Sequence, residues 1–242
     1  TGLNFYSFDA RGHGRSEGPR GDAPGTGDLV KDLELYLELL AREAGVKHPI
    51  LLGHSMGGLI AMAFCLKYSN QWHVRALITS GTAIRPHLNT EQRVKKAVGQ
   101  VLARFVPELA LASGLPPTHL SHDPRVARSY EQDPLTHSRL SIRFGLSLLE
   151  TGEDVRERAG RLKIPGLIQH GEADMMTDMG GSLEFYQRCG SSDRELQLYP
   201  GLYHEIYNET VAEREKVLSD LKRWIFQRLP QPVATAPLAS SV

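Results

Sequence analysis

The stretch that decides the fold is six residues long and reads Gly53-His54-Ser55-Met56-Gly57-Gly58. An apolar run at 49–52 precedes it, and an apolar, helix-like run at 59–64 follows. The G-x-S-x-G pattern between a strand and a helix is typical of a nucleophile elbow, a strained turn that exposes its serine. We expect Gly53 and Gly57 to be glycine because side chains at these positions would clash. The sequence therefore predicts Ser55 as a nucleophile.

The residue after the serine has its own expected role. Met56 begins the predicted helix, so its backbone N–H lies at the positive end of the helix dipole without an intrahelical acceptor. We expect this N–H to form part of an oxyanion hole beside Ser55. The simpler interpretation of the string is a glycine-rich turn with an incidental serine. An acid and a histidine further along the chain, in the right order, favour the elbow.

An acid and a histidine do follow, each after a predicted strand. Asp174 comes after the apolar run at 164–170, and His204 comes after the run at 195–199. Serine, acid and histidine in this order match the order of the α/β-hydrolase triad. A serine hydroxyl needs an imidazole to remove its proton, and the imidazole needs a carboxylate to hold one tautomer. We therefore predict His204 as the base and Asp174 as the acid that orients it.

Other residues compete for these roles or lie close to them. Glu172 and Asp178 are the alternatives for the acid, and Asp174 is preferred because it lies nearest the expected turn. His54 lies inside the elbow and is expected to be a packing residue. His170 is expected to cap the strand that precedes Asp174.

Five motifs occur in the order found in one branch of a known family. They are DARGHGRSEG at 9–18, GHSMGG at 53–58, SHDP with YEQDPL at 121–124 and 130–135, HGEAD at 170–174, and YPGLYHEIYNE at 199–209. From about residue 5 to about residue 228 the chain resembles the monoacylglycerol lipase and lysophospholipase branch of the serine aminopeptidase S33 family. The resemblance implies an α/β-hydrolase fold: a mainly parallel sheet flanked by helices, with an inserted helical cap.

The start of the chain departs from the pattern of that family. By the resemblance, residues 1–8 correspond to strand four, so we expect the strands normally before it to be missing. The missing segment would carry strand three, which lies between strands four and five, and a loop with the second oxyanion N–H. We therefore expect an incomplete sheet and half of an oxyanion hole, as in a fragment.

The alternation of apolar runs predicts two domains. The core covers 1–81 and 164–229, while 82–163 is too long for a loop and is predicted to form the cap. Residues 230–242 are expected to be a flexible tail. Helices are predicted at 28–45, 91–105, 136–151 and 209–229, and strands near 49–53 and 74–80.

Three cap and turn features have alternative interpretations. A set of apolar cap residues either lines an acyl-chain pocket above Ser55 or forms the cap's own core, and the core is the default: Leu109, Leu111, Leu115, Phe144 and Leu148. Residues 119–123 carry two histidines and an aspartate, but their spacing fits no zinc pattern, which favours a polar loop. The glycine-rich stretch at 9–16 is interpreted as a tight turn rather than a phosphate-binding nest.

Composition excludes several classes of protein. The chain has 242 residues, of which 40% are hydrophobic, and 28 basic residues balance 28 acidic ones, so no nucleic-acid partner is expected. No signal peptide or membrane span is visible, and a cytoplasmic location is expected. Cys65 and Cys189 are too few for a disulfide framework and are expected to be free thiols.

The residues and the resemblance together predict a serine hydrolase that cleaves carboxylic esters of lipid-like substrates, such as a monoacylglycerol or a lysophospholipid. We expect no cofactor and no metal, and the partner is a small-molecule lipid or ester. Transient contact with a membrane surface through the cap is left open, as are the substrate-binding residues. The alternatives are a general carboxylesterase or thioesterase, and a catalytically impaired fragment.

Overall fold

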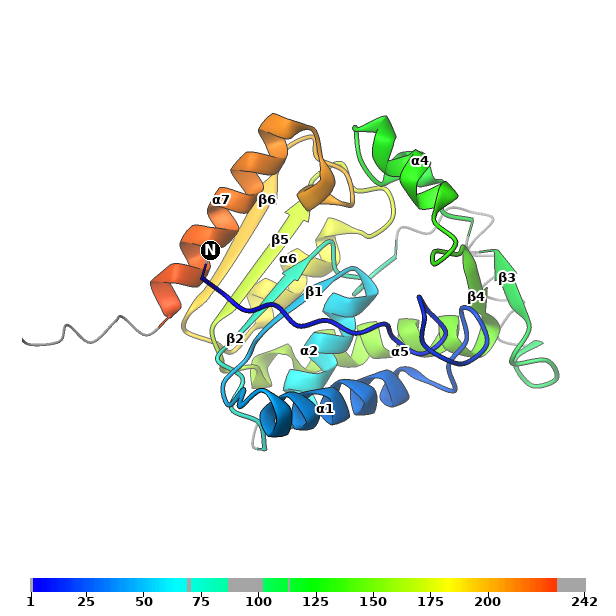
Figure 1. The fold of residues 1–242 in the computed structure, drawn as a ribbon, viewed down its shortest axis with the longest axis horizontal. Coiled ribbons are helices and arrows are strands. Elements are labelled where there is room, and N and C mark those ends of the chain that lie inside the picture. The colour runs from blue at the N-terminus through cyan, green and yellow to red at the C-terminus, as the bar shows by residue number, and fades with distance from the viewer. Residues whose placement is uncertain (1, 69–70, 87–101, 113, 230–242) are drawn as a thin grey trace, which may run out of the picture.

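The computed structural model describes residues 2–68, 71–86, 102–112 and 114–229 (Figure 1). Its centre is a four-stranded parallel sheet in the order β1-β2-β5-β6. The strands are β1 (Ile50–His54), β2 (Ala76–Ser80), β5 (Gly166–Gly171) and β6 (Arg194–Tyr199). All four lie within a few residues of the predicted runs.

Burial explains why these runs form strands. Every residue of β2 and β5, the two interior strands, is buried. Strands covered on both faces of a parallel sheet carry nearly continuous apolar residues, as these do. The strand β1 differs, because Leu52 at its free edge is exposed.

Helices cover both faces of the sheet. The larger apolar cluster holds residues of α1 (Thr26–Glu43), α2 (Met56–Tyr68), α5 (Ile142–Arg158) and α6 (Met179–Arg188). The second cluster joins α7 (Val211–Arg228) to β2 and β5 through Trp224. The predicted helices at 28–45 and 209–229 correspond to α1 and α7.

The remaining elements lie mainly in the predicted cap. They are the strands β3 (Ala110–Ala112) and β4 (Arg139–Ser141), the helix α4 (Pro124–Gln132) and the short helices η1 (Pro117–His119), η2 (Ala159–Arg161) and η3 (Ile206–Asn208). The strands β3 and β4 pair antiparallel. Most of the helix predicted at 91–105, and the tail at 230–242, lie outside the described residues.

The helix predicted at 136–151 begins later than expected. Residues 139–141 pair with β3, and α5 begins at Ile142 because the Ser141 Oγ accepts a hydrogen bond from the Phe144 N–H at 3.3 Å. This helix packs against α1 and α2, and Phe144 is buried in the larger apolar cluster. The cap boundary at residue 163 therefore remains a prediction.

The two interpretations of the apolar cap residues both need revision. Phe144 and Leu148 belong to the α/β core cluster, so they are neither a separate cap core nor an acyl pocket. Leu109, Leu111 and Leu115 are exposed.

The segment expected to be strand four does not pair with the sheet. Residues 2–10 run beside β1 without strand hydrogen bonds (Figure 1). A cavity of about 870 Å³ separates this segment from β1 and extends to the elbow at Met56 and Gly57. The segment is held instead by Tyr36 of α1. The Tyr36 hydroxyl donates to the Ser7 carbonyl at 2.9 Å, and the Tyr36 ring contacts the ring of Phe8. The prediction of a strand here was wrong, because residues 2–10 pair with no strand in the described part of the chain.

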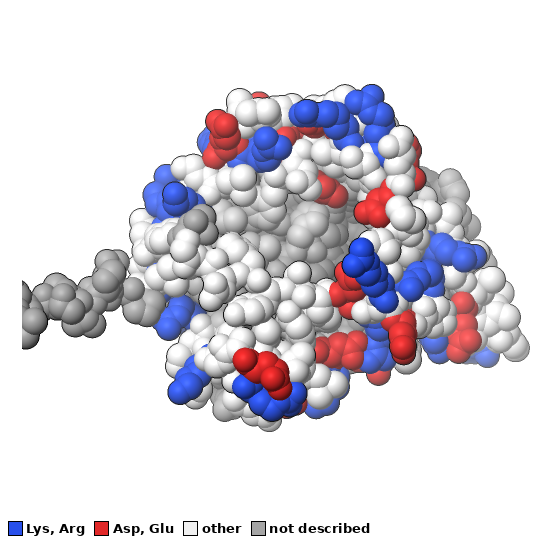
Figure 2. All heavy atoms as spheres, viewed as in Figure 1, with Lys and Arg blue, Asp and Glu red and all other residues white. Residues whose placement is uncertain are grey.

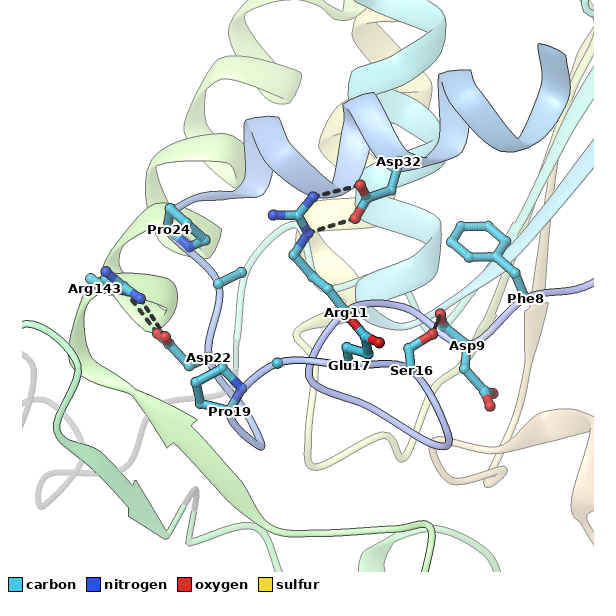
Figure 3. Close-up of a pocket in the computed structure, with 12 residues that line it drawn as sticks. Phe8, Asp9, Arg11, Ser16, Glu17, Pro19, Asp22, Pro24, Asp32 and Arg143 are labelled. Carbon is cyan, nitrogen blue, oxygen red and sulfur yellow. Dashed lines mark hydrogen bonds and ion pairs between the residues drawn. The ribbon is translucent and has the colours of Figure 1, made fainter. Parts of the chain in front are cut away.

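The glycine-rich stretch after this segment folds as the expected tight turn (Figure 3). Gly12 has φ +70°, and a side chain there would place its Cβ 2.7 Å from the Pro19 carbonyl oxygen. The Arg11 guanidinium makes two 2.6 Å hydrogen bonds to Asp32 on α1, so it is neutralised within the fold.

Two further sequence expectations concern the membrane and the thiols. None of the helices in the described ranges has both the length and the apolarity that a membrane span needs. Cys65 and Cys189 are both free and buried.

Candidate active site

The elbow between β1 and α2 has the predicted strained geometry. Ser55 has φ +53°, and it is the only non-glycine residue with positive φ in the described part of the chain. Its N–H donates to the Ser80 carbonyl at 2.9 Å, which ties the turn to β2. A non-glycine residue in this region carries strain that the surrounding structure must hold in place.

The glycines around Ser55 are not equally constrained. A side chain at Gly53 would place its Cβ 2.5 Å from the Gly57 carbonyl oxygen, so glycine is required there. At Gly57 the same Cβ would meet nothing within 4 Å, so the expectation that this glycine avoids a clash was wrong. Gly57 borders the cavity beside β1. The second constrained position is Gly58, where a Cβ would lie 2.8 Å from the Thr82 hydroxyl.

Met56 is the first residue of α2. Its N–H therefore has no acceptor within the helix, and the helix dipole favours negative charge at this end. The role of this N–H in an oxyanion hole stays a prediction.

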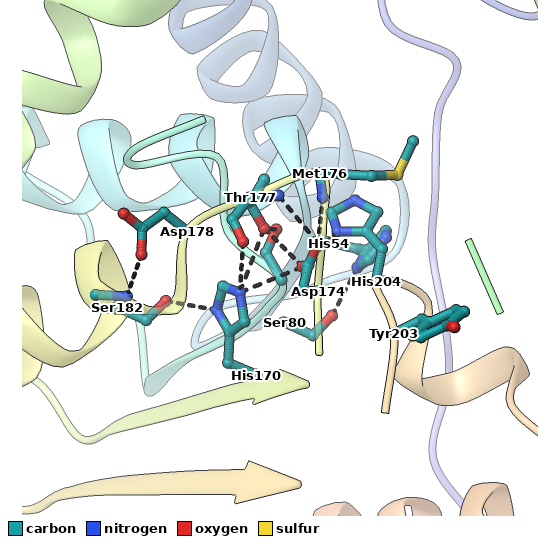
Figure 4. A network of polar contacts seen from close by, with 12 residues as sticks. His54, Ser80, His170, Asp174, Met176, Thr177, Asp178, Ser182, Tyr203 and His204 are labelled. Atoms are coloured by element: carbon teal, nitrogen blue, oxygen red, sulfur yellow. Dashed lines mark hydrogen bonds and ion pairs between the residues drawn. The ribbon is translucent and has the colours of Figure 1, made fainter. Parts of the chain in front are cut away.

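Asp174 and His204 form a short, buried hydrogen bond (Figure 4). The distance from His204 Nδ1 to Asp174 Oδ2 is 2.7 Å, and the residues are only 4% and 6% exposed. Asp174 lies in the turn after β5 and His204 in the loop after β6, so the parallel sheet brings them together. The Asp174 carboxylate faces Nδ1 and leaves Nε2 as the nitrogen that can accept a proton.

The carboxylate of Asp174 is held by further donors. Its Oδ1 accepts from the backbone N–H groups of Met176 at 2.8 Å and Thr177 at 3.0 Å. Its Oδ2 accepts from the Thr177 hydroxyl at 2.7 Å. Burial by itself raises the pKa of Asp174, but hydrogen bonds from His170, His204 and the Thr177 N–H lower it well below its ordinary value. Asp174 is therefore ionised at neutral pH.

His170 is a second histidine on the same carboxylate, and the sequence did not predict it. Its Nε2 lies 3.2 Å from Asp174 Oδ2, and its Nδ1 lies 2.8 Å from the Ser182 hydroxyl on α6. A nitrogen that faces a carboxylate carries a proton, so His170 Nδ1 accepts from Ser182 when the ring is neutral. The expectation that His170 caps the strand was wrong, since the side chain is fully buried against Asp174.

The competing acids lie elsewhere. Glu172 is exposed. Asp178 caps the N-terminus of α6 by accepting from the Gly180 N–H at 2.8 Å, and it pairs with Arg85 at 2.7 Å. Of the three candidates, Asp174 is the one whose hydrogen bond to His204 is present.

Ser55 and His204 both lie at the carboxyl end of the sheet. In the described part of the chain, Ser55 Oγ makes no direct hydrogen bond to the His204 imidazole. Gly81, which follows β2, packs against the His204 ring: a Cβ there would lie 3.1 Å from Nδ1. Its N–H is held by the Gln169 carbonyl at 3.0 Å. In ligand-free enzymes the contact between nucleophile and base is often long and tightens when substrate binds.

His54 is more than a packing residue. Its ring lies 4.7 Å from that of His204, and its Nδ1 lies 2.9 Å from the Ser80 hydroxyl. Burial, together with the neighbouring His204, lowers the pKa of His54 to about 3. A neutral ring therefore lies beside His204 and adds no positive charge to the site at neutral pH.

A hollow in the molecular surface lies at the carboxyl end of the sheet. Figure 2 shows this hollow between α7, α4 and the N-terminal segment, with charged side chains on parts of its rim. The carboxyl ends of β1, β2 and β5 point toward it. Ligands of open α/β sheets bind at this end of the strands.

The sequence pattern of the family described as "Serine aminopeptidase, S33" matches residues 1–211. The chain belongs to this α/β-hydrolase family. It is similar to the monoacylglycerol lipase of Mycolicibacterium smegmatis, with 34% identity over 230 residues that cover 95% of this chain and 80% of the relative. Identity to the human monoglyceride lipase is 29% over 239 residues, 98% of this chain and 77% of that protein.

Solved structures of this family confirm the fold. The crystal structure of the Paleococcus ferrophilus monoacylglycerol lipase matches with a TM-score of 0.83 and 29% identity, covering 93% of this chain and 83% of that one. A soluble variant of the Saccharomyces cerevisiae monoglyceride lipase, in complex with a substrate analog, matches with a TM-score of 0.81 and 26% identity over 92% and 77% of the two chains. The protein is therefore an α/β-hydrolase related to monoacylglycerol lipases.

Proposed function

We propose that this protein is a serine hydrolase that cleaves carboxylic esters of lipid-like substrates, with a monoacylglycerol or a lysophospholipid as the preferred class. The observation that carries the proposal is the buried 2.7 Å hydrogen bond between His204 and Asp174. It holds the imidazole in the tautomer that accepts a proton at Nε2, near a strained serine.

In the proposed reaction, Ser55 Oγ attacks the ester carbonyl while His204 Nε2 takes the hydroxyl proton. The imidazolium then gives this proton to the leaving alcohol, and an acyl-serine remains. Water attacks the acyl-enzyme in the second half, with His204 again as the base. Asp174 orients His204 throughout, and the Met56 N–H stabilises the oxyanion.

The lipid-like substrate class is supported by two independent facts. The relatives named above are monoacylglycerol and monoglyceride lipases. In addition, exposed apolar side chains gather at residues 105–115 in the predicted cap: Phe105, Val106, Leu109, Leu111 and Leu115. These residues lie close together along the chain, and a contiguous exposed apolar patch is typical of a surface that meets a lipid or another apolar partner. We include transient contact of the cap with a membrane surface in the proposal.

A chain-length series tests the substrate class. We would measure kcat/KM on p-nitrophenyl esters from acetate to palmitate, and on 1-monoacylglycerols of matched acyl length, with Ser55→Ala as the blank. The proposal expects kcat/KM to rise from acetate toward medium or long chains and glycerol release from the monoacylglycerols. Highest activity on acetate with no glycerol release would instead indicate a general carboxylesterase, and thioester cleavage above ester cleavage would indicate a thioesterase.

A further inference from the structure

Glu209 is a buried carboxylate outside the predicted triad. The residue is 1% exposed and lies five positions after His204, between η3 and α7. Its Oε1 accepts from the Tyr203 N–H at 2.8 Å and lies 3.0 Å from the His122 Nδ1. Its Oε2 accepts from the His122 N–H at 3.0 Å and lies 3.3 Å from the Ser121 hydroxyl. The backbone N–H groups of Tyr203 and His122 are both donors to this carboxylate.

These donors come from two distant parts of the chain. Tyr203 precedes His204 in the loop at 199–209, which we call the histidine loop, whereas Ser121 and His122 belong to the cap segment 120–122. Two further hydrogen bonds join the same segments. The Glu205 N–H donates to the Leu120 carbonyl at 2.8 Å, and the Ser121 hydroxyl donates to the Asn208 carbonyl at 2.9 Å. Glu209 therefore lies at the centre of a joint between the cap segment and the histidine loop.

A ring contact strengthens this joint. The imidazole of His122 stacks on the Tyr203 ring with centroids 3.7 Å apart. Tyr203 is thus held on its backbone by Glu209 and on its ring by His122. Since Tyr203 is the direct neighbour of His204, any shift of its backbone moves the attachment point of the catalytic imidazole.

The charge of Glu209 fits this arrangement. Burial raises the pKa of Glu209, but the Tyr203 N–H and both donors of His122 outweigh burial, and the net pKa is lowered. A buried carboxylate is tolerated when donors surround it, and hydrogen bonds to a charged acceptor are stronger than neutral ones.

We propose that Glu209 is a positioning residue that places His204 by locking the histidine loop to cap segment 120–122. The inference rests on the proposed function, because it assigns Glu209 to the reaction of Ser55 and His204. Its consequence is that the cap does more than shape a binding site. Through Glu209, the position of the cap segment sets the position of the base.

The sharpest test is Glu209→Gln, which keeps the size of the side chain but turns one acceptor into a donor. Either orientation of the amide sets its NH₂ group against a donor of Tyr203 or His122, so one buried bond is lost. Loss of such a bond to a charged group is expected to lower kcat about tenfold or more, with KM changed less than about threefold. Glu205→Gln is the matched control: its carboxylate lies in the same loop and accepts from the exposed Asn208 side chain, and full activity is expected.

A double-mutant cycle separates positioning from general stability. We would measure hydrolysis of p-nitrophenyl butyrate well below the melting temperature, using the full chain, for Glu209→Gln in the parent and in a His204→Ala background. If Glu209 acts through His204, Glu209→Gln has almost no further effect once the imidazole is gone. An equal fold-loss in both backgrounds would overturn the proposal, and so would unchanged kcat in Glu209→Gln.

His122→Phe provides a second variant in case Glu209→Gln does not fold. It keeps a ring against Tyr203 and removes only the Nδ1 hydrogen bond, so we expect kcat to fall about threefold to tenfold with no further effect in the His204→Ala background. Unchanged kcat would contradict the proposal. Failure of the proposed function is a separate result: the parent itself would show no hydrolysis above Ser55→Ala.

Discussion

Asp174→Asn tests the assignment of the acid, and the surrounding donors predict which way the amide will turn. Two rigid backbone N–H groups, of Met176 and Thr177, bind Oδ1 of Asp174, so the amide oxygen must take that position. The amide NH₂ then faces His204 Nδ1, where Oδ2 accepted a proton at 2.7 Å. A donor there forces Nδ1 to accept, which moves the imidazole proton to Nε2. The base can then no longer take a proton from Ser55.

The expected magnitude follows from this tautomer change. The corresponding acid-to-amide change in a serine protease, which is a worked example of this effect rather than a value derived for this chain, lowers kcat about 10⁴-fold. That corresponds to about 5.4 kcal/mol in the activation free energy at 1.36 kcal/mol per factor of ten. The amide oxygen keeps the two backbone donors on the Oδ1 side, while the NH₂ group takes the Oδ2 position, which faces both imidazoles and the Thr177 hydroxyl. We therefore expect a loss of the same order here.

The assay is steady-state hydrolysis of p-nitrophenyl butyrate by Asp174→Asn and by the matched control Asp178→Asn. Asp178 caps α6 and pairs with Arg85 away from His204, so its replacement should change kcat less than about threefold and affect mainly stability, by about 1 kcal/mol. Circular dichroism and thermal melting would verify that both variants are folded. A loss below tenfold in Asp174→Asn, or a larger loss in Asp178→Asn, would refute the assignment of the acid.

Three further predictions concern stability. Gly53→Ala should lower the free energy of unfolding by about 1–3 kcal/mol, because the added Cβ meets rigid backbone, while Gly57→Ala should change it by less than about 1 kcal/mol. Urea titration of the two variants measures both values, and equal effects would contradict the elbow geometry. Burial lowers the pKa of His13, whose ring lies 4.8 Å from that of His137, so folding favours the neutral imidazole. The contribution of His13 to stability should be complete above the ordinary histidine pKa near 6.5 and should be lost as the pH falls below it. The urea midpoint should therefore drop more between pH 7.5 and pH 5.5 in the parent than in His13→Gln. A parallel drop in both proteins would count against this. Trp224→Ala should cost about 3–5 kcal/mol, since the indole is 1% exposed between α7 and the sheet, and a loss under 1 kcal/mol in thermal melting would be inconsistent with that packing.

Much of the fold could be predicted from local patterns. Apolar periodicity identified α1, and short apolar runs identified the strands of the sheet. The start of α5 could not be predicted in this way, since apolar residues at helical spacing continue upstream of Ile142. There the helix start is decided by pairing of 139–141 with β3, a contact that no local pattern encodes.

In the candidate site, too, some residues could be predicted from local sequence patterns and others could not. The order of Ser55, Asp174 and His204 along the chain follows from the connectivity of the sheet, so a single sequence can point to them. His170 and Glu209 act through contacts with residues that are not their neighbours in a motif: Glu209 meets His122, 87 positions away. Only the three-dimensional arrangement indicates that these buried polar groups support the loops of the acid and the base.

The most direct test of the central claim is covalent labelling of the nucleophile. The folded chain would be treated with a fluorophosphonate, and intact mass and peptide mapping would report the number and position of adducts. We predict one adduct per chain, on Ser55, formed in parallel with loss of esterase activity, absent in Ser55→Ala and much slower in His204→Ala. An adduct on another residue, or esterase activity that survives in Ser55→Ala within tenfold of the parent, would contradict the assignment of Ser55 as the nucleophile.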